Sequence, residues 1–234
     1  MASAVEANGA TYVIYYGWLT EDGAGAPNES ALRIAAARVP LLIAHAWTAE
    51  PQRHLNLSPT VRALMRSTGT VVYAYVATRC GQLPLGTVEA AVEESLDAGA
   101  DGIFFDEADP LRESAKLAYY AGLASRIRAR GKRVIVNPGV AQLGENIMDV
   151  ADCVMVEHRW RDLRSGSLWA FQYAAERFMG VSRNEENAMG YAVNDGRAIA
   201  DTREAWRRGI GWHTSTDRYI ELPAWFERYI EAVR

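Results

Sequence analysis

The stretch Gly102-Ile103-Phe104-Phe105-Asp106-Glu107 decides the fold prediction, because an apolar run that follows a glycine stops abruptly on two acids. Such a run predicts a strand that is buried on both faces, as in a parallel sheet. Side chains alternate along a strand, so Phe104 and Asp106 share one face while Ile103 and Phe105 share the other. Acids at the C-terminal end of a parallel strand lie where α/β proteins keep their catalytic groups. We therefore expect Asp106 to serve a site rather than merely to end the strand.

Strand and helix signals alternate along the chain on both sides of this stretch. The expected strands are β-branched, aromatic or apolar runs, at 12–18, 40–46, 70–77, 102–107, 133–136, 153–156, 178–182 and 210–214. The expected helices are amphipathic segments between cap, proline and glycine residues, at 30–38, 59–67, 87–98, 110–130, 143–150, 169–176, 198–208 and 223–233. Ser30 and Asp109 are the expected N-caps of two of these helices.

This order predicts a parallel sheet, and eight strand–helix units favour a (β/α)8 TIM barrel over an open sheet. With 49% hydrophobic and 23% charged residues, the chain has the composition of a globular protein with a sizeable core. No linker or composition break divides it. We expect an α/β protein with an N-terminal tail over residues 1–11 and a single barrel domain over residues 12–234.

Charge, hydropathy and cysteine content exclude several classes of function. A net charge of −4 provides no basic surface for nucleic acid. No apolar run approaches the roughly 18 residues of a membrane-spanning helix, so no membrane partner is expected. Cys80 and Cys153 are too few for a disulfide scaffold and lack metal-site spacing, so each is expected in or near the core. Residues 1–10 lack the basic region and apolar core of a signal peptide, which favours a cytoplasmic protein.

In a barrel, the C-terminal ends of all strands meet at one face, where a site can form. The residues expected at these ends are Tyr15, Tyr16, His45, Thr78, Arg79, Asp106, Glu107, Asn137, Glu157, His158, residues 182–184, His213 and Thr214. Asn137 lies on the strand face of Ile135, and Glu157 on that of Met155, so both can point into the barrel. For the first and third strands, the sequence leaves the inward face open.

Three carboxylates from two strands are the most informative part of this set. Asp106, Glu107 and Glu157 would lie close together, and like charges held in a cleft raise one pKa, which keeps one acid protonated near neutral pH. Other members have plain structural alternatives. Asn137 precedes a Pro-Gly turn, and His158 can simply be a hydrogen-bonded neighbour.

The motifs around these residues resemble the spherulation-specific family 4 proteins. That group belongs with glycoside hydrolases acting on galactosamine-containing polysaccharides, near the endo-α-1,4-polygalactosaminidases. The matching pieces keep the family's order over roughly the last two-thirds of the chain, and they are VYAYVAT (72–78), GIFFDE (102–107), Tyr119-Tyr120, VNPG (136–139), VMVEH (154–158) and LPAW (222–225). GIFFDE with a downstream strand-end Glu is the most specific of them.

The resemblance implies a (β/α)8 glycosidase with Asp106, Glu107 and Glu157 in the catalytic cluster. We expect no cofactor and no metal. The candidate substrate contacts are the other strand-end residues and one tyrosine of the third strand, namely Tyr15, Tyr16, His45, Tyr75, Arg79, Asn137, His158 and His213. The family is often secreted, so the compartment stays open. After the second strand, His45-Ala46-Trp47-Thr48 stands where the family tends to have Asn-Pro and a Gly-rich loop, so the substrate also stays open.

The expected reaction is hydrolysis of a glycosidic bond in an amino-sugar polysaccharide, with Asp106 as nucleophile or charge stabiliser and Glu157 as acid/base. Glu107 would tune these groups or exchange the acid role. One alternative is a metal-dependent hydrolase or lyase with strand-end histidines as ligands, although no His-x-His or His-Glu-x-x-His spacing supports it. Another is a carbohydrate-binding or pathway protein that kept the barrel and lost hydrolysis. The partner in each case is a carbohydrate or other small polar molecule; the retaining or inverting course and the oligomeric state stay open.

Overall fold

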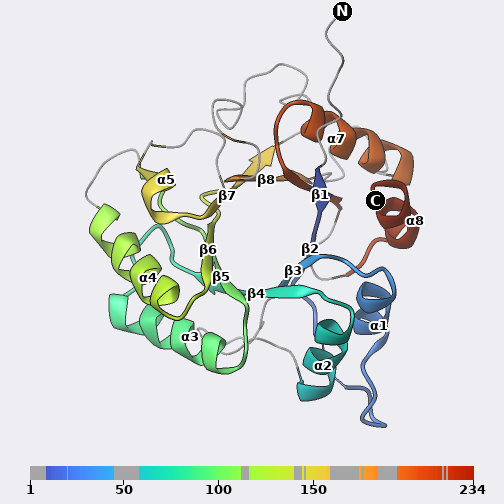
Figure 1. The fold of residues 1–234 in the computed structure, drawn as a ribbon, viewed down its shortest axis with the longest axis horizontal. Coiled ribbons are helices and arrows are strands. Elements are labelled where there is room, and N and C mark those ends of the chain that lie inside the picture. The colour runs from blue at the N-terminus through green and yellow to red at the C-terminus, as the bar shows by residue number, and fades with distance from the viewer. Residues whose placement is uncertain are drawn as a thin grey trace, which may run out of the picture.

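The strands form one parallel sheet that curves into a nearly closed barrel, with the helices packed around its outside (Figure 1). The computed structural model describes residues 9–19, 21–44, 58–111, 116–139, 144, 146–158, 174, 177–183, 194–217, 219 and 221–234. Within them, the strand order is β1-β9-β8-β7-β6-β5-β4-β3-β2. Because β1 and β2 follow each other in the chain, the two ends of this order meet and close the ring. The predicted (β/α)8 TIM barrel is confirmed.

The observed elements lie close to the expected ranges. The strands are β1 Ala10–Thr11, β2 Val13–Tyr15, β3 Leu41–Ala44, β4 Val71–Ala77, β5 Gly102–Asp106, β6 Arg133–Val136, β7 Cys153–His158, β8 Phe178–Arg183 and β9 Trp212–Thr216. The helices are α1 Glu29–Ala36, α2 Pro59–Ser67, α3 Leu85–Asp97, α4 Leu117–Ala129, α5 Ile147–Val150, α7 Asp195–Arg207 and α8 Phe226–Ala232. The helix expected at 169–176 falls outside the described residues except for residue 174. No helix among the described residues is both long and apolar enough to cross a bilayer.

Two hydrophobic layers hold the barrel together, one on each side of the sheet. The larger layer lies between strands and helices and contains Ile103 and Phe105 of β5. The smaller layer fills the inside of the barrel and contains Phe104, together with Ile135 of β6 and Met155 of β7. All five side chains are buried. The alternation predicted for the central strand is therefore confirmed, and it sets the direction of the acids that follow.

The two N-caps expected from the sequence, Ser30 and Asp109, are not the ones that the structure shows. The N-cap of α1 is Asn28, whose side chain accepts a hydrogen bond from the Ala31 backbone N–H, whereas Ser30 lies inside the helix. The α4 helix begins at Leu117 instead of Pro110. Leu111 has a φ of 51°, so no right-handed helix runs on from Pro110. Asp109 still accepts a hydrogen bond, from the Leu111 backbone N–H at 2.8 Å, but it closes a short turn rather than capping a helix.

Candidate active site

Asp106, Asn137 and Glu157 come from three adjacent strands and extend the inner face of each. Asp106 ends β5 two residues after Phe104, and Asn137 follows β6 two residues after Ile135. Glu157 lies in β7, two residues after Met155. Because Phe104, Ile135 and Met155 all belong to the inner layer, the three polar side chains point to the mouth of the barrel at its carboxyl end.

Asn137 joins the two acids through its side-chain amide. Its Nδ2 donates to Oδ1 of Asp106 at 2.7 Å and to Oε1 of Glu157 at 2.9 Å, while its Oδ1 accepts from the Gly139 backbone N–H at 3.0 Å. The Asn137 side chain is 2% exposed. All the hydrogen-bonding groups of this amide therefore have protein partners, and its orientation follows from them. Because both hydrogen bonds start from the same nitrogen, Oδ1 of Asp106 and Oε1 of Glu157 cannot lie farther apart than the sum of the two distances.

Burial raises the pKa of Asp106 to about 6 from an ordinary 3.8, and the charge of nearby Glu157 adds a smaller upward push. Three donors act in the other direction: the Glu107 backbone N–H, the Tyr75 hydroxyl and the Asn137 amide. The sequence suggested mutual repulsion as the main cause of a raised pKa in the cluster. The structure assigns the larger influence to removal of the carboxylate from water.

Tyrosine rings form one wall beside Asp106. The Tyr75 hydroxyl donates to the Asp106 carboxylate, and burial and the charge of Asp106 raise the pKa of Tyr75 above its ordinary value. The Tyr16 ring meets the Tyr75 ring edge-on, with 5.2 Å between centroids, and lies 5.2 Å from the Tyr219 ring. Burial and Asp106 likewise raise the pKa of Tyr16. Both tyrosines stay neutral hydrogen-bond donors at any physiological pH.

The sequence did not indicate Tyr219. It follows β9 in a polar stretch without periodicity, and its backbone carbonyl accepts from the Tyr16 N–H at 2.5 Å. This contact joins the last strand end to the first. The only signal in the sequence was a tyrosine after the last predicted strand, and such tyrosines are too common for one of them to indicate a site residue.

Glu107 lies at the mouth beside the inward-facing set, in a strained turn. It is exposed and has a φ of 48°, a left-handed conformation that costs a non-glycine residue about 1–3 kcal/mol. Its carbonyl accepts from the Cys80 backbone N–H at 2.6 Å and from the Thr78 hydroxyl at 3.0 Å. Arg79, which is also exposed, and Cys80 are left-handed too, with φ of 46° and 54°. These hydrogen bonds thus join the turn after β4 to the turn after β5, beside Asp106.

Two predicted substrate contacts do not reach the mouth. Tyr15 lies in the outer layer, where its hydroxyl donates to Ser30 Oγ at 2.9 Å. His213 is fully buried, and its Nδ1 lies 2.8 Å from Thr202 Oγ1 of α7. Both predictions are wrong for one reason, which is strand parity: the neighbouring Tyr16 and Trp212 take the inward direction. His45 and the side chain of His158 lie outside what the structure describes.

Among the residues that the structure describes, no group of three or more His, Cys, Asp or Glu could hold a metal ion. Cys80 and Cys153 are both free thiols. Cys153 lies at the start of β7 beside the inner layer, where burial raises its pKa, in agreement with a near-core place. Cys80 is exposed in the turn after β4, so the expectation that it lies in or near the core is wrong.

Solved structures with a similar fold include several carbohydrate enzymes. A class V chitinase from Pseudomonas fluorescens has a TM-score of 0.64 and 12% identity, with 96% of this chain and 99% of that chain covered. The GH18 chitinase ChiB of Flavobacterium johnsoniae has a TM-score of 0.62 and 11% identity, covering 96% and 94%. The spore cortex-lytic enzyme SleL of Bacillus megaterium has a TM-score of 0.62 and 9% identity, covering 98% and 75%. At such identities the likeness concerns the fold.

No curated protein matches the sequence. The pattern of one protein family does, over residues 49–233, which include the strand ends that carry Asp106, Asn137 and Glu157. That family is described as Spherulation-specific family 4, and the chain belongs to it.

Proposed function

We propose that this protein is a glycoside hydrolase that cleaves an amino-sugar polysaccharide with Asp106 and Glu157 as its catalytic pair. The observation that carries the proposal is the Asn137 amide, which holds one oxygen of each acid at 2.7 and 2.9 Å. Two carboxyl groups held at a fixed separation on one open face are what glycosidic hydrolysis requires. The family and the chitinase-like fold agree with this chemistry.

The separation of the acids favours a retaining course. An inverting pair leaves room for a water molecule and is roughly 6.5–9.5 Å apart, whereas a retaining pair is about 5–5.5 Å apart. The Asn137 amide holds one oxygen of Asp106 and one of Glu157 closer together than the inverting range, which supports the retaining course. In the retaining course one acid attacks the anomeric carbon and forms a glycosyl ester, which water then hydrolyses.

Asp106 suits the attacking role. Its oxygens accept from the Tyr75 hydroxyl, the Asn137 amide and the Glu107 backbone N–H, a set of donors that fits a carboxylate and keeps its orientation fixed. Its pKa of about 6 leaves it mainly ionised at neutral pH and weakly solvated, which favours nucleophilic attack. Glu157 reaches the mouth from another strand and would give its proton to the leaving oxygen, then take one from the attacking water.

The mouth also suits an amino-sugar ring. The Tyr16 and Tyr75 rings offer faces and edges for stacking against the flat side of a sugar. Three carboxylates near one opening attract the ammonium groups of a de-N-acetylated polymer. Glu107, exposed at the rim, is available for such a contact.

The test is hydrolysis of a polymer panel by the wild type and by matched variants. Polygalactosamine, chitosan, chitin, neutral cellulose and aryl glycosides of amino sugars are incubated with each protein, with and without EDTA, and released reducing ends are counted. Proton NMR of the first product reports whether the anomeric configuration is retained. We expect cleavage of an amino-sugar polymer that EDTA leaves unchanged, loss of all turnover in Asp106→Asn, and a partial defect in Glu157→Gln on aryl glycosides with good leaving groups.

Three outcomes contradict the proposal. Full activity of a well-folded Asp106→Asn protein removes the catalytic pair. Activity that EDTA abolishes and one divalent ion restores supports a metal-dependent hydrolase. Tight binding of an amino-sugar polymer without any cleavage supports a carbohydrate-binding barrel.

A further inference from the structure

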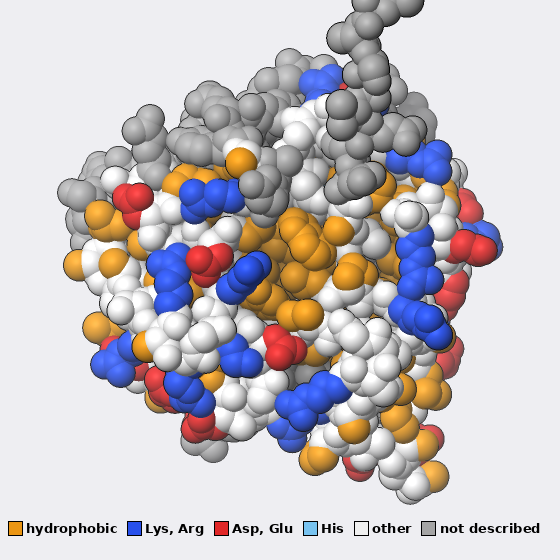
Figure 2. All heavy atoms as spheres, in the orientation of Figure 1, with side chains coloured by type: hydrophobic (Ala, Val, Ile, Leu, Met, Phe, Trp, Pro, Cys, Tyr) orange, Lys and Arg blue, Asp and Glu red, His pale blue; other side chains and the backbone are white. Residues whose placement is uncertain are grey.

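A hollow of about 180 Å³ lies at the amino ends of the strands, opposite the mouth that carries Asp106. Its walls come from the first residues of several strands, including Leu41 of β3, Val71 of β4, Arg133 of β6 and Trp212 of β9. Figure 2 shows apolar side chains gathered in the hollowed centre of this face, with basic and acidic side chains around them. The amino-end face of a barrel ordinarily contributes stability, so an open apolar hollow there calls for an explanation.

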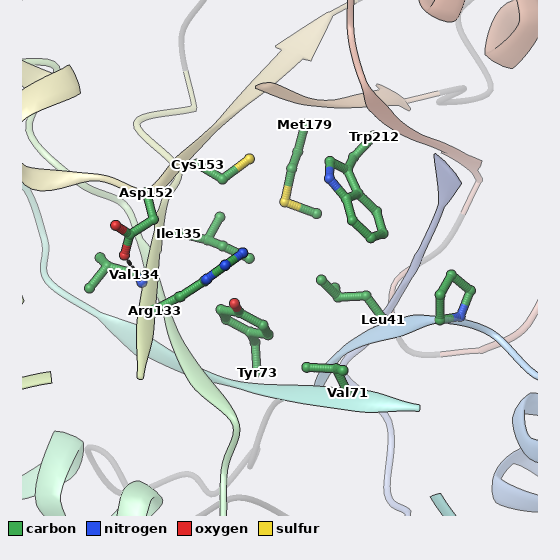
Figure 3. A pocket seen from close by; sticks show the side chains of 11 residues that line it. Leu41, Val71, Tyr73, Arg133, Val134, Ile135, Asp152, Cys153, Met179 and Trp212 are labelled. Carbon is green, nitrogen blue, oxygen red and sulfur yellow. Dashed lines mark hydrogen bonds between the residues drawn. The ribbon is translucent and has the colours of Figure 1, made fainter. Parts of the chain in front are cut away.

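Side-chain size accounts for the hollow. Gly102 begins β5 without a side chain, and a Cβ placed there would meet the Tyr73 ring at 2.2 Å, so Tyr73 leans across β5. Figure 3 shows the Tyr73 and Trp212 rings on two sides of the space, with Met179 between Cys153 and Trp212. The walls are thus two flat aromatic surfaces and a flexible thioether, which together accept a flat apolar group.

A single cation reaches into this apolar space. Arg133 stands on the same strand face as Ile135, and Figure 3 shows its side chain extending over the hollow toward Met179. Its positive charge acts on the Tyr73 hydroxyl, whose pKa burial raises to about 12. Among the residues that the structure describes, Arg133 takes part in no ion pair.

The one acid among the residues that line the hollow is already engaged elsewhere. Asp152 binds Arg128 at 3.0 Å through Oδ1, and its Oδ2 accepts from the Val134 backbone N–H at 2.8 Å. The Arg133 guanidinium therefore keeps its donors available above a pocket whose other lining side chains, apart from Asp152 and the Tyr73 hydroxyl, are apolar. A guanidinium favours a carboxylate because its paired N–H groups match the two carboxylate oxygens.

We propose that this hollow binds a small carboxylate with a single flat apolar ring. The ring would lie between Tyr73 and Trp212, and the carboxylate would accept from Arg133 and the Tyr73 hydroxyl. The volume is smaller than the roughly 300–1,000 Å³ of sites for drug-sized ligands, so the ligand is one ring with a short chain. This site is separate from the catalytic mouth and does not depend on the proposed hydrolase function.

The test uses 3-phenylpropionate as the probe and 3-phenylpropanamide as its neutral counterpart, both titrated calorimetrically. Because hydrogen bonds to a charged group contribute about 1.5–3 kcal/mol, the wild type should bind the acid at least about tenfold more tightly than the amide. Arg133→Met keeps the apolar stem and should remove that preference while affinity for the amide persists. Arg126→Met, which removes a guanidinium from the outer surface of α4, should behave like the wild type.

A second variant tests the location. Val71 is 40% exposed at the edge of the hollow, so Val71→Trp fills the space without opening a cavity in the core, and both probes should lose binding. The proposal is overturned if the wild type binds neither probe at millimolar concentration, if it binds both equally, or if Arg133→Met keeps the preference for the acid. Unchanged binding to a folded Val71→Trp protein would place the probe elsewhere and overturn it as well.

Discussion

Replacing Asp106 by asparagine should stabilise the folded protein above pH 6 while it abolishes turnover. The pKa of Asp106 is raised by burial from 3.8 to about 6, so the folded state holds this proton more tightly than the unfolded chain does. As the pH rises from 3.8 to 6, the unfolded chain loses the proton first, and the stability of the fold decreases. Well above pH 6 the decrease in stability is complete and stays constant. Asparagine carries no charge at any of these pH values, so the variant does not undergo this decrease.

The magnitude follows from the size of the pKa shift. One pKa unit corresponds to about 1.4 kcal/mol, so a shift from 3.8 to about 6 destabilises the folded wild type by about 3 kcal/mol at pH 8. The substitution replaces one carboxylate oxygen by an NH2 group, so one of the three donors around Asp106 loses its acceptor, which lowers the stability of the fold by about 1 kcal/mol. The net gain of about 2 kcal/mol should raise Tm by about 4–8 °C for a chain of this length.

Thermal and urea unfolding of both proteins at pH 4, 5, 6, 7 and 8 measures the effect. The difference in stability should grow between pH 4 and 6 and level off above pH 6. Asp217→Asn, at an exposed position after β9, is the matched control and should show no such growth. A difference that is independent of pH, or an Asp106→Asn protein that is less stable than the wild type at pH 8, would refute the reasoning from burial.

Two other substitutions separate the inner face from the outer face. The kcat/KM of the wild type should fall as the pH drops below about 6, where Asp106 becomes protonated. Tyr75→Phe should shift this fall to higher pH, because the Tyr75 hydroxyl lowers the pKa of Asp106. A pH–rate profile that is unchanged in Tyr75→Phe contradicts this. Tyr15→Phe should lower the free energy of unfolding by about 1 kcal/mol, because the hydrogen bond to Ser30 is lost. It should leave kcat and KM unchanged, since Tyr15 faces the helices. Altered kinetics would place Tyr15 in the mouth.

The barrel and the direction of its acids could be predicted from the sequence because both depend on local periodicity. Strand and helix signals alternate along the chain, and the side-chain period of two carries the inward direction from Phe104 to Asp106. The sequence could not choose the inward face for Tyr15 and His213, which were expected at the mouth only because they lie at strand ends. The first strand carries buried apolar residues on both faces, Val13 and Ile14, and β9 carries polar residues on both, so neither pattern marked which face was inner.

Contacts between strands could not be predicted in this way. The sequence offered two roles for Asn137, a structural one in the Pro-Gly turn and a substrate contact; in the structure its Oδ1 accepts from the Gly139 N–H while its Nδ2 donates to both acids. That double role needs β5, β6 and β7 side by side in register. Tyr219 reaches the mouth only because the ring closes between the first and last strands.

The sequence by itself determined the fold class, the family and the strand ends that carry Asp106, Asn137 and Glu157, because these follow from patterns within a few neighbouring residues. The tertiary structure alone decided the bridge between the acids, the raised pKa of Asp106 and the hollow at the opposite face. These depend on distances between strands, on removal of a charge from water, and on the volumes of side chains that meet across the barrel. Such quantities arise only when distant segments pack together.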